Sequence, residues 1–159
     1  MKDFAVSGAR RLETAADTQA FGEEIGRALE AGDVVILDGP LGAGKTTFTQ
    51  GLARGLGVKG RVTSPTFVIA REHRSLDDGP ALIHVDAYRL LGEGGGDPLG
   101  ELDALDLDSA LTDAVVVAEW GGGLVEQISA SYLLITLDRT TATLEDPESE
   151  ARLVSWELH

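Results

Sequence analysis

The run GPLGAGKT at positions 39–46 constrains this chain more than any other feature. It matches G-x-x-x-x-G-K-[ST], the loop with which nucleoside triphosphatases bind phosphate groups. The apolar, β-branched run 34–38 before it predicts a buried strand. The segment 46–56 after it predicts a helix, with Phe48, Leu52 and Leu56 at helical spacing. The sequence therefore predicts a phosphate-binding loop between a strand and a helix.

The chemistry of this loop gives roles to its residues. Glycines let the backbone N–H groups turn inward, and the positive end of the helix dipole adds to the attraction for an anion. Lys45 is expected to reach the β- and γ-phosphates of ATP or ADP, and the Thr46 hydroxyl to ligate Mg²⁺. The predicted nucleotide-binding residues are Leu41, Gly42, Ala43, Gly44, Lys45, Thr46 and Thr47.

Composition narrows the class of protein. A chain of 159 residues suits one domain, here 1–159, and its apolar content supports a core. The absence of cysteine excludes disulfides and thiolate metal sites. The balance of 13 basic and 27 acidic residues, a formal charge of −14, disfavours a non-specific grip on nucleic acid. No apolar run is long enough to span a membrane and no signal peptide is evident, so a cytoplasmic protein is expected.

The remaining pattern predicts an α/β domain with a mixed sheet. Thr14 and Asp17 have the spacing of a helix N-cap, and the helix that follows is expected to bury one face. That face consists of Phe21, Ile25, Ala28 and Leu29. Further strands are expected near 4–6 and at 66–71, 81–86, 114–118, 132–137 and 151–156. The last two are expected to pair around a polar loop at 138–150, and a short helix is expected at 102–111.

Two acids stand where a nucleotide enzyme needs them, at the carboxyl ends of apolar strands. Asp86 ends the run 82–86, and Glu119 follows the run 115–118. Glu119 follows a fully apolar strand, and a charge in that position needs a partner such as a metal ion. Either acid can also be a solvated residue at the end of a strand or a cap. His84 is expected to be a hydrogen-bonded core residue, or a residue that supports a ligand from behind, and not a ligand itself. His73 and His159 are expected on the surface.

Four motifs together resemble the TsaE family, small ATPases of bacterial tRNA threonylcarbamoyladenosine biosynthesis. They are the loop at 39–47, SPTF at 64–67, HVDAYRL at 84–90 and Glu119-Trp120. The resemblance implies a three-layer P-loop NTPase-like α/β domain with a mixed central sheet. It also implies the partner proteins TsaD and TsaB, with tRNA contacted only indirectly through that complex. The chain departs from the family pattern at Pro40 and Gly121.

The family roles, carried onto this chain, make Lys45 and Asp86 catalytic and assign Mg²⁺ to Thr46 and Glu119. ATP hydrolysis is expected to be slow alone and stimulated by partners. Two other functions remain open: a small-molecule P-loop kinase, which the lack of Lys or Arg in 92–100 disfavours, and a nucleotide-dependent binding module that does not hydrolyse. For the adenine pocket, the segment before the first helix and the final hairpin are both candidates.

Overall fold

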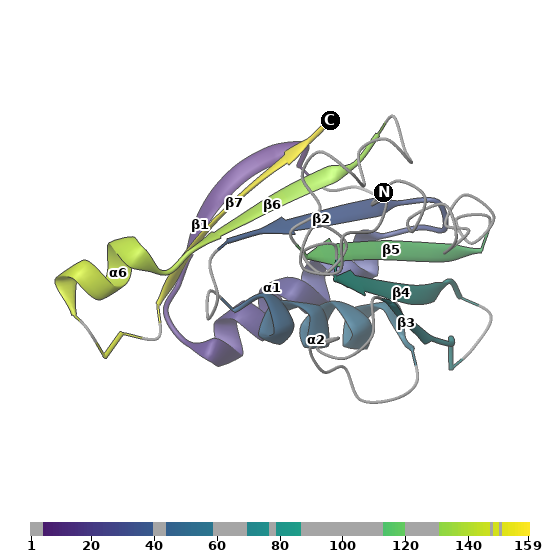
Figure 1. Ribbon diagram of the computed structural model, residues 1–159, viewed down its shortest axis with the longest axis horizontal. Helices are drawn as coiled ribbons and strands as arrows, with labels where there is room; N and C mark the ends of the chain where they lie inside the picture. Colours follow the sequence, from purple (N-terminus) through teal and green to yellow (C-terminus); the bar gives the residue numbers. More distant parts are fainter. Residues whose placement is uncertain are drawn as a thin grey trace, which may run out of the picture.

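The computed structural model describes residues 5–39, 44–58, 70–76, 79–86, 113–119, 131–146, 148–149 and 151–159. The elements in chain order are β1 (Ser7–Leu12), α1 (Ala15–Ala28), β2 (Val34–Asp38), α2 (Lys45–Leu56), β3 (Ala70–His73), β4 (Ala81–Asp86), β5 (Ala114–Glu119), β6 (Leu133–Asp138), α6 (Thr140–Glu145) and β7 (Arg152–Leu158). Figure 1 shows α1 and α2 side by side on one face of the sheet. No described helix is long and apolar enough to cross a membrane.

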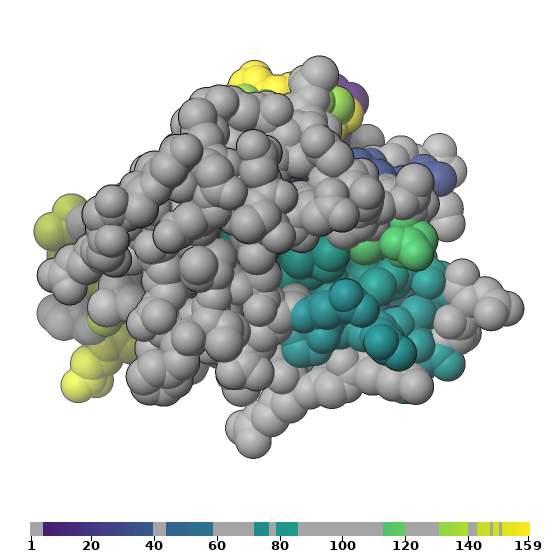
Figure 2. Space-filling model, turned by 45° about the vertical axis from the view of Figure 1, so that its right-hand side comes forward, coloured from purple at the N-terminus to yellow at the C-terminus, as the bar shows by residue number. Residues whose placement is uncertain are grey.

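The strands form one mixed sheet, as the sequence predicts, in the order β1-β7-β6-β2-β5-β4-β3. Strands β4, β5, β2 and β6 run parallel to one another, while β3 pairs antiparallel with β4 at one edge, and β7 and β1 continue antiparallel from β6 to the other. The predicted pairing of β6 with β7 is confirmed, and β3 with β4 forms a second antiparallel pair of consecutive strands. In Figure 2 residues of β3 and β4, in teal, reach the surface, as expected at a sheet edge.

The central strands are buried on both faces. On one face Val35 and Leu37 join a core with Phe48 and Leu52 of α2. Alternate residues point to the opposite face, and Ile36 there is buried too. Burial on both faces is the environment that a three-layer α/β arrangement gives its central strands. The short helix expected at 102–111 lies outside the described residues.

The first helix begins as predicted. The Thr14 hydroxyl accepts a hydrogen bond from the Asp17 backbone N–H at 3.1 Å, and the Asp17 carboxylate accepts one from the Thr14 N–H at 3.3 Å. This reciprocal capping box satisfies two backbone donors that the start of a helix would otherwise leave without partners. The predicted buried face is confirmed, although Leu29 is the C-cap and not part of the helix.

Helices α1 and α2 touch through their backbones at four glycines. A Cβ added to Gly51 would lie 1.9 Å from the backbone oxygen of Gln19. Added to Gly22, Gly26 or Gly55, it would lie 2.1 to 2.2 Å from a carbonyl oxygen of the facing helix. Real Cβ atoms cannot approach that closely, so only glycine permits this spacing. The loop helix α2 is therefore held tightly by α1.

Three local expectations are wrong. The first strand is Ser7–Leu12 and not 4–6. It lies at a sheet edge and exposes most of its side chains, so it lacks an apolar signal. The segment 138–150 contains the helix α6, which a polar composition alone does not reveal. The third strand runs to His73, two residues beyond its predicted end, while the positions 66–69 of that prediction lie outside the described residues.

The edge strand β1 is held to the core by an aromatic and cationic cluster. The Trp156 ring lies 5.2 Å from the Phe21 ring between centroids, and the Arg10 guanidinium lies 5.0 Å from the Phe21 centroid. Glu24 accepts a hydrogen bond from Arg10 at 2.8 Å and thereby raises the pKa of Arg10. The indole N–H of Trp156 donates to the Ala5 carbonyl at 3.1 Å. Apolar packing thus joins β7 to α1, with the charged groups at its margin.

Candidate nucleotide-binding site

The glycine loop leaves the central strand β2 and enters α2. Gly39, directly after β2, has φ 153°, and Gly44, the N-cap of α2, has φ 99°. Both values lie in the region that side chains rarely adopt, so the backbone at the two ends of the loop requires glycine. Leu41, Gly42 and Ala43 lie outside the described residues. Parallel strands on either side of β2 place their carboxyl ends at the same edge as the loop, where α/β sheets bind ligands.

Lys45 is the first residue of α2, one position earlier than the predicted helix start, and it is buried. Its Nζ donates a hydrogen bond of 2.7 Å to the Gly39 carbonyl oxygen. This contact joins the two ends of the loop and holds an ammonium group at a helix N-terminus. Thr46 and Thr47, in the first turn, remain partly exposed. The arrangement concentrates positive potential and backbone N–H donors at the loop, as an anion site requires.

Glu119 ends β5 beside the loop strand. Its Cα is in register with Leu37 on β2 and with Asp86 on β4. Glu119 is buried, and its Oε1 lies 3.2 Å from Nε2 of the fully buried His84. The expectation that His84 is a hydrogen-bonded core residue is confirmed. Among the described residues, His84 is the side chain that contacts the Glu119 carboxylate.

Asp86 ends β4, as predicted, and its backbone faces that of Glu119 across the parallel pair. The two acids therefore occupy neighbouring positions at the carboxyl edge of the sheet. Ser64, Phe67, Tyr88, Arg89 and Trp120, from the motifs of the resemblance, lie outside the described residues.

The oxygen-bearing side chains at the site suit Mg²⁺ better than they suit a metal ion that is bound by protein groups alone. Among the described residues no group of three or more His, Cys, Asp or Glu side chains gathers. Mg²⁺ keeps several water ligands and is bound by one or two protein oxygens plus substrate phosphates. A buried carboxylate at Glu119 and a hydroxyl at Thr46 meet that need, and cysteine is absent from the chain.

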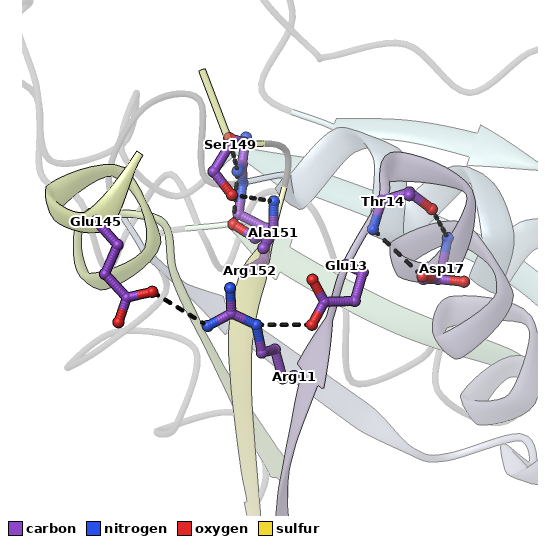
Figure 3. Close-up of polar contacts among 8 residues, drawn as sticks. All are labelled: Arg11, Glu13, Thr14, Asp17, Glu145, Ser149, Ala151 and Arg152. Atoms are coloured by element: carbon purple, nitrogen blue, oxygen red, sulfur yellow. Dashed lines mark hydrogen bonds and ion pairs between the residues drawn. The ribbon is translucent and has the colours of Figure 1, made fainter. Parts of the chain in front are cut away.

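The two candidate segments for the adenine pocket meet at one corner. Leu12, which precedes α1, pairs in register with Arg152, which begins β7. A Cβ added to Gly44 would lie 3.6 Å from Cγ2 of Thr18 and 4.0 Å from Cγ of Arg152, so the first turn of α1 and the start of β7 flank the end of the loop. Figure 3 shows Arg152 and Thr14 at this corner. No local pattern in the sequence marks Arg152, because only the pairing of β1 with β7 brings it close to the loop.

The other two histidines differ from each other. His159 is exposed, as expected, and stacks on Tyr132 with 4.9 Å between ring centroids. His73 was expected on the surface but is 7% exposed. The chain beyond His73 comes back to the end of α2, where the Leu76 N–H donates to the Gly57 carbonyl at 2.8 Å.

A strand, a glycine loop and a helix that begins with a buried lysine define an α/β protein of the P-loop NTPase-like class. A family model described as "Threonylcarbamoyl adenosine biosynthesis protein TsaE" matches residues 12–148. The chain belongs to the TsaE family.

Known relatives support this assignment over most of the chain. A Mycobacterium tuberculosis protein is 49% identical over 150 residues, which cover 94% of this chain and 86% of the relative. A Streptomyces coelicolor protein is 54% identical over 125 residues, covering 79% and 81%. Both are named tRNA threonylcarbamoyladenosine biosynthesis protein TsaE. The crystal structure of Bacillus subtilis YdiB is similar with a TM-score of 0.67 at 30% identity, covering 94% of this chain and 84% of that one.

Proposed function

We propose that this protein binds and hydrolyses ATP with Mg²⁺ as a component of the machinery that makes tRNA N6-threonylcarbamoyladenosine. The names of its relatives support the pathway. The observation that carries the nucleotide site is the buried Lys45, hydrogen-bonded across the glycine loop to Gly39, with Glu119 in register beside the loop strand. ATP and Mg²⁺ are the ligands whose charges suit this set of groups.

Lys45 and the loop bind the triphosphate in this proposal. The Lys45 ammonium is already buried and fixed by a carbonyl oxygen, so little reorganisation accompanies the arrival of a phosphate. Backbone N–H groups of the loop and the first turn of α2 supply the remaining donors, from residues 41–47. The adenosine part lies toward the corner formed by Thr18 and Arg152, because both flank Gly44 at the end of the loop.

The acids at the sheet edge provide the other half of the site. Thr46 and Glu119 hold Mg²⁺, which when bound neutralises charge on the β- and γ-phosphates. Asp86 orients the attacking water or accepts its proton, as its place beside Glu119 on the neighbouring strand allows. Catalysis of this kind depends mainly on positioning and electrostatics.

TsaD and TsaB are the proposed protein partners, and tRNA is reached through them. A formal charge of −14 gives this chain little affinity of its own for a polyanion. A partner can also complete the active site, since an arginine supplied in trans accelerates related enzymes by about 10³–10⁵-fold. We therefore expect slow hydrolysis by the isolated protein and faster hydrolysis with the partners.

Calorimetric titration with ADP and with a non-hydrolysable ATP analogue, each in Mg²⁺ and in EDTA, tests the site. The wild-type protein should bind with Mg²⁺-linked affinity, and Lys45→Ala should abolish binding, because it removes the buried cation. The control is Arg54→Ala, which removes an exposed cation from the same helix and should bind as wild type does. No Mg²⁺-linked uptake by the wild-type protein would contradict the proposal.

Phosphate release, measured with and without the purified TsaD–TsaB pair, tests the reaction. We expect acceleration by the pair, and Glu119→Ala should raise the Mg²⁺ concentration needed for half-maximal rate. Equal rates with and without partners would count against a partner-stimulated ATPase. Binding without phosphate release, even with partners, would favour the non-hydrolysing binding module.

A further inference from the structure

The contact between His84 and Glu119 extends the proposed Mg²⁺ site, on which this inference rests. His84 is fully buried, and its Cα is in register with Val117, two residues before Glu119 on β5. Nε2 lies 3.2 Å from Oε1 of Glu119. Among the described residues, Oε2 of the same carboxylate has no hydrogen-bond partner, and Nδ1 of His84 has none.

These contacts identify the tautomer of His84. A hydrogen on Nε2 makes the 3.2 Å contact a hydrogen bond to a carboxylate oxygen and leaves only a lone pair on Nδ1. A hydrogen on Nδ1 would leave a buried donor without a partner and would set two lone pairs against each other. Unpaired buried N–H groups are rarer than under-satisfied acceptors. His84 therefore donates from Nε2 to the carboxylate.

The donor at Nε2 orients Glu119 through one of its two oxygens. Within the described part of the chain Glu119 forms no ion pair with Lys or Arg, and its side chain is 6% exposed. A buried carboxylate without a cation is costly. Apolar side chains at these two positions would fill the same space at a lower cost in folding free energy. The protein instead keeps a carboxylate here, with Oε1 bonded to His84 and Oε2 without a partner among the described residues.

We propose that His84 is a positioning residue that fixes the Glu119 carboxylate for Mg²⁺. It donates from Nε2 to Oε1, restricts the rotation of a side chain with several rotatable bonds, and leaves Oε2 for the cation. His84 does not ligate the metal, because the nitrogen that faces the site carries the hydrogen. Hydrogen-bonded partners of metal ligands commonly contribute about 10–100-fold to metal affinity.

The test compares ADP affinity in Mg²⁺ with that in EDTA, so that the ratio of the two reports the metal alone. His84→Leu should lower this ratio by about 10-fold and leave the affinity in EDTA unchanged. His84→Gln, whose amide can donate from a similar position, should restore it. Val85→Ala is the matched control, because Val85 is equally buried on the same strand but points to the opposite face. It should lower the melting temperature without changing the ratio.

The pair Glu119→Ala and Glu119→Ala/His84→Leu completes the experiment. Both should show the same ratio, because His84 has nothing to orient once the carboxylate is gone. A wild-type ratio in His84→Leu, or an equal loss of affinity in EDTA, would overturn the inference while leaving the nucleotide site intact. If His84→Leu does not fold, His84→Asn, whose amide is too short, is compared with His84→Gln, and equal ratios in the two would overturn it. A wild-type protein without any Mg²⁺ effect would overturn both this inference and the proposed function.

Discussion

Two halves of the sheet are stabilised in different ways. Strands β2, β5 and β4, next to the glycine loop, are parallel, and β2 and β5 consist almost wholly of buried residues. Strands β6, β7 and β1 form an antiparallel ribbon, in which buried positions alternate with partly exposed ones along β6 and become fewer toward β1. The first half carries the candidate site, and the second half ends at an exposed edge.

The polar contacts follow the same division. The loop half contains two buried polar contacts, Lys45 with Gly39 and His84 with Glu119. The ribbon half pairs its charges at the surface, as in Arg10 with Glu24 and Arg11 with Glu13. Buried polar contacts are costly to break, whereas exposed ion pairs contribute little. Substitutions in the loop half should therefore cost more stability than substitutions of similar size in the ribbon.

The largest effect is expected from Gly51→Ala in the contact between α1 and α2. The added methyl would meet the backbone oxygen of Gln19 at 1.9 Å, and a backbone atom cannot turn aside as the end of a flexible side chain can. We expect a loss of about 3 kcal/mol in the free energy of unfolding, at the upper end for overpacking. This loss exceeds the roughly 1 kcal/mol by which Ala favours a helix over Gly. Urea denaturation followed by circular dichroism measures it.

Gly8→Ala provides the comparison in the ribbon. Its methyl would lie 2.4 Å from Cζ2 of Trp156, which is a side-chain atom at the far end of the indole. A side chain can shift at lower cost than a backbone, so we expect a smaller loss of about 1 kcal/mol, at the low end for overpacking. Equal losses for Gly51→Ala and Gly8→Ala would remove the proposed difference between the two halves.

Local patterns in the sequence were sufficient for several elements. The glycine loop, the buried strand 34–38 and the capping box at Thr14 each depend on residues a few positions apart. The place of Glu119 at the end of an apolar strand follows in the same way. Short-range hydrogen bonding and periodicity determine these features, so the sequence alone predicts them.

Other features depend on contacts between distant segments. The sequence predicts a hydrogen-bonded position for His84 and a partner for the charge of Glu119, but only the register of β4 with β5 makes the two residues partners of each other. The burial of His73 depends on how the chain beyond it packs on α2. Similarly, Arg152 reaches Gly44 only because β7 pairs with β1 and β6. Such pairings are tertiary, and no local pattern encodes them.

A medium effect is expected where the ribbon passes into α1. Thr14→Ala removes the hydroxyl that accepts from the Asp17 N–H at 3.1 Å. The loss of an N-cap side chain should lower the free energy of unfolding by about 1 kcal/mol. Thr14→Ser retains the hydroxyl and should recover most of that loss. If Thr14→Ser is as destabilised as Thr14→Ala, methyl packing and not capping explains the role of Thr14.

The smallest effect is expected from Arg11→Ala in the ribbon. Figure 3 shows Arg11 between Glu13 and Glu145, at 2.7 and 3.9 Å, and all three side chains are well exposed. Water and salt screen such pairs, so the free energy of unfolding should change by less than about 0.5 kcal/mol. Denaturation at low and at high salt measures this, and the difference between wild type and variant should shrink as salt rises. A loss above about 1 kcal/mol that persists at high salt would contradict this expectation. The surface contact would then stabilise the ribbon as strongly as the Thr14 cap stabilises α1. The ribbon would not be the half of the sheet that tolerates substitution.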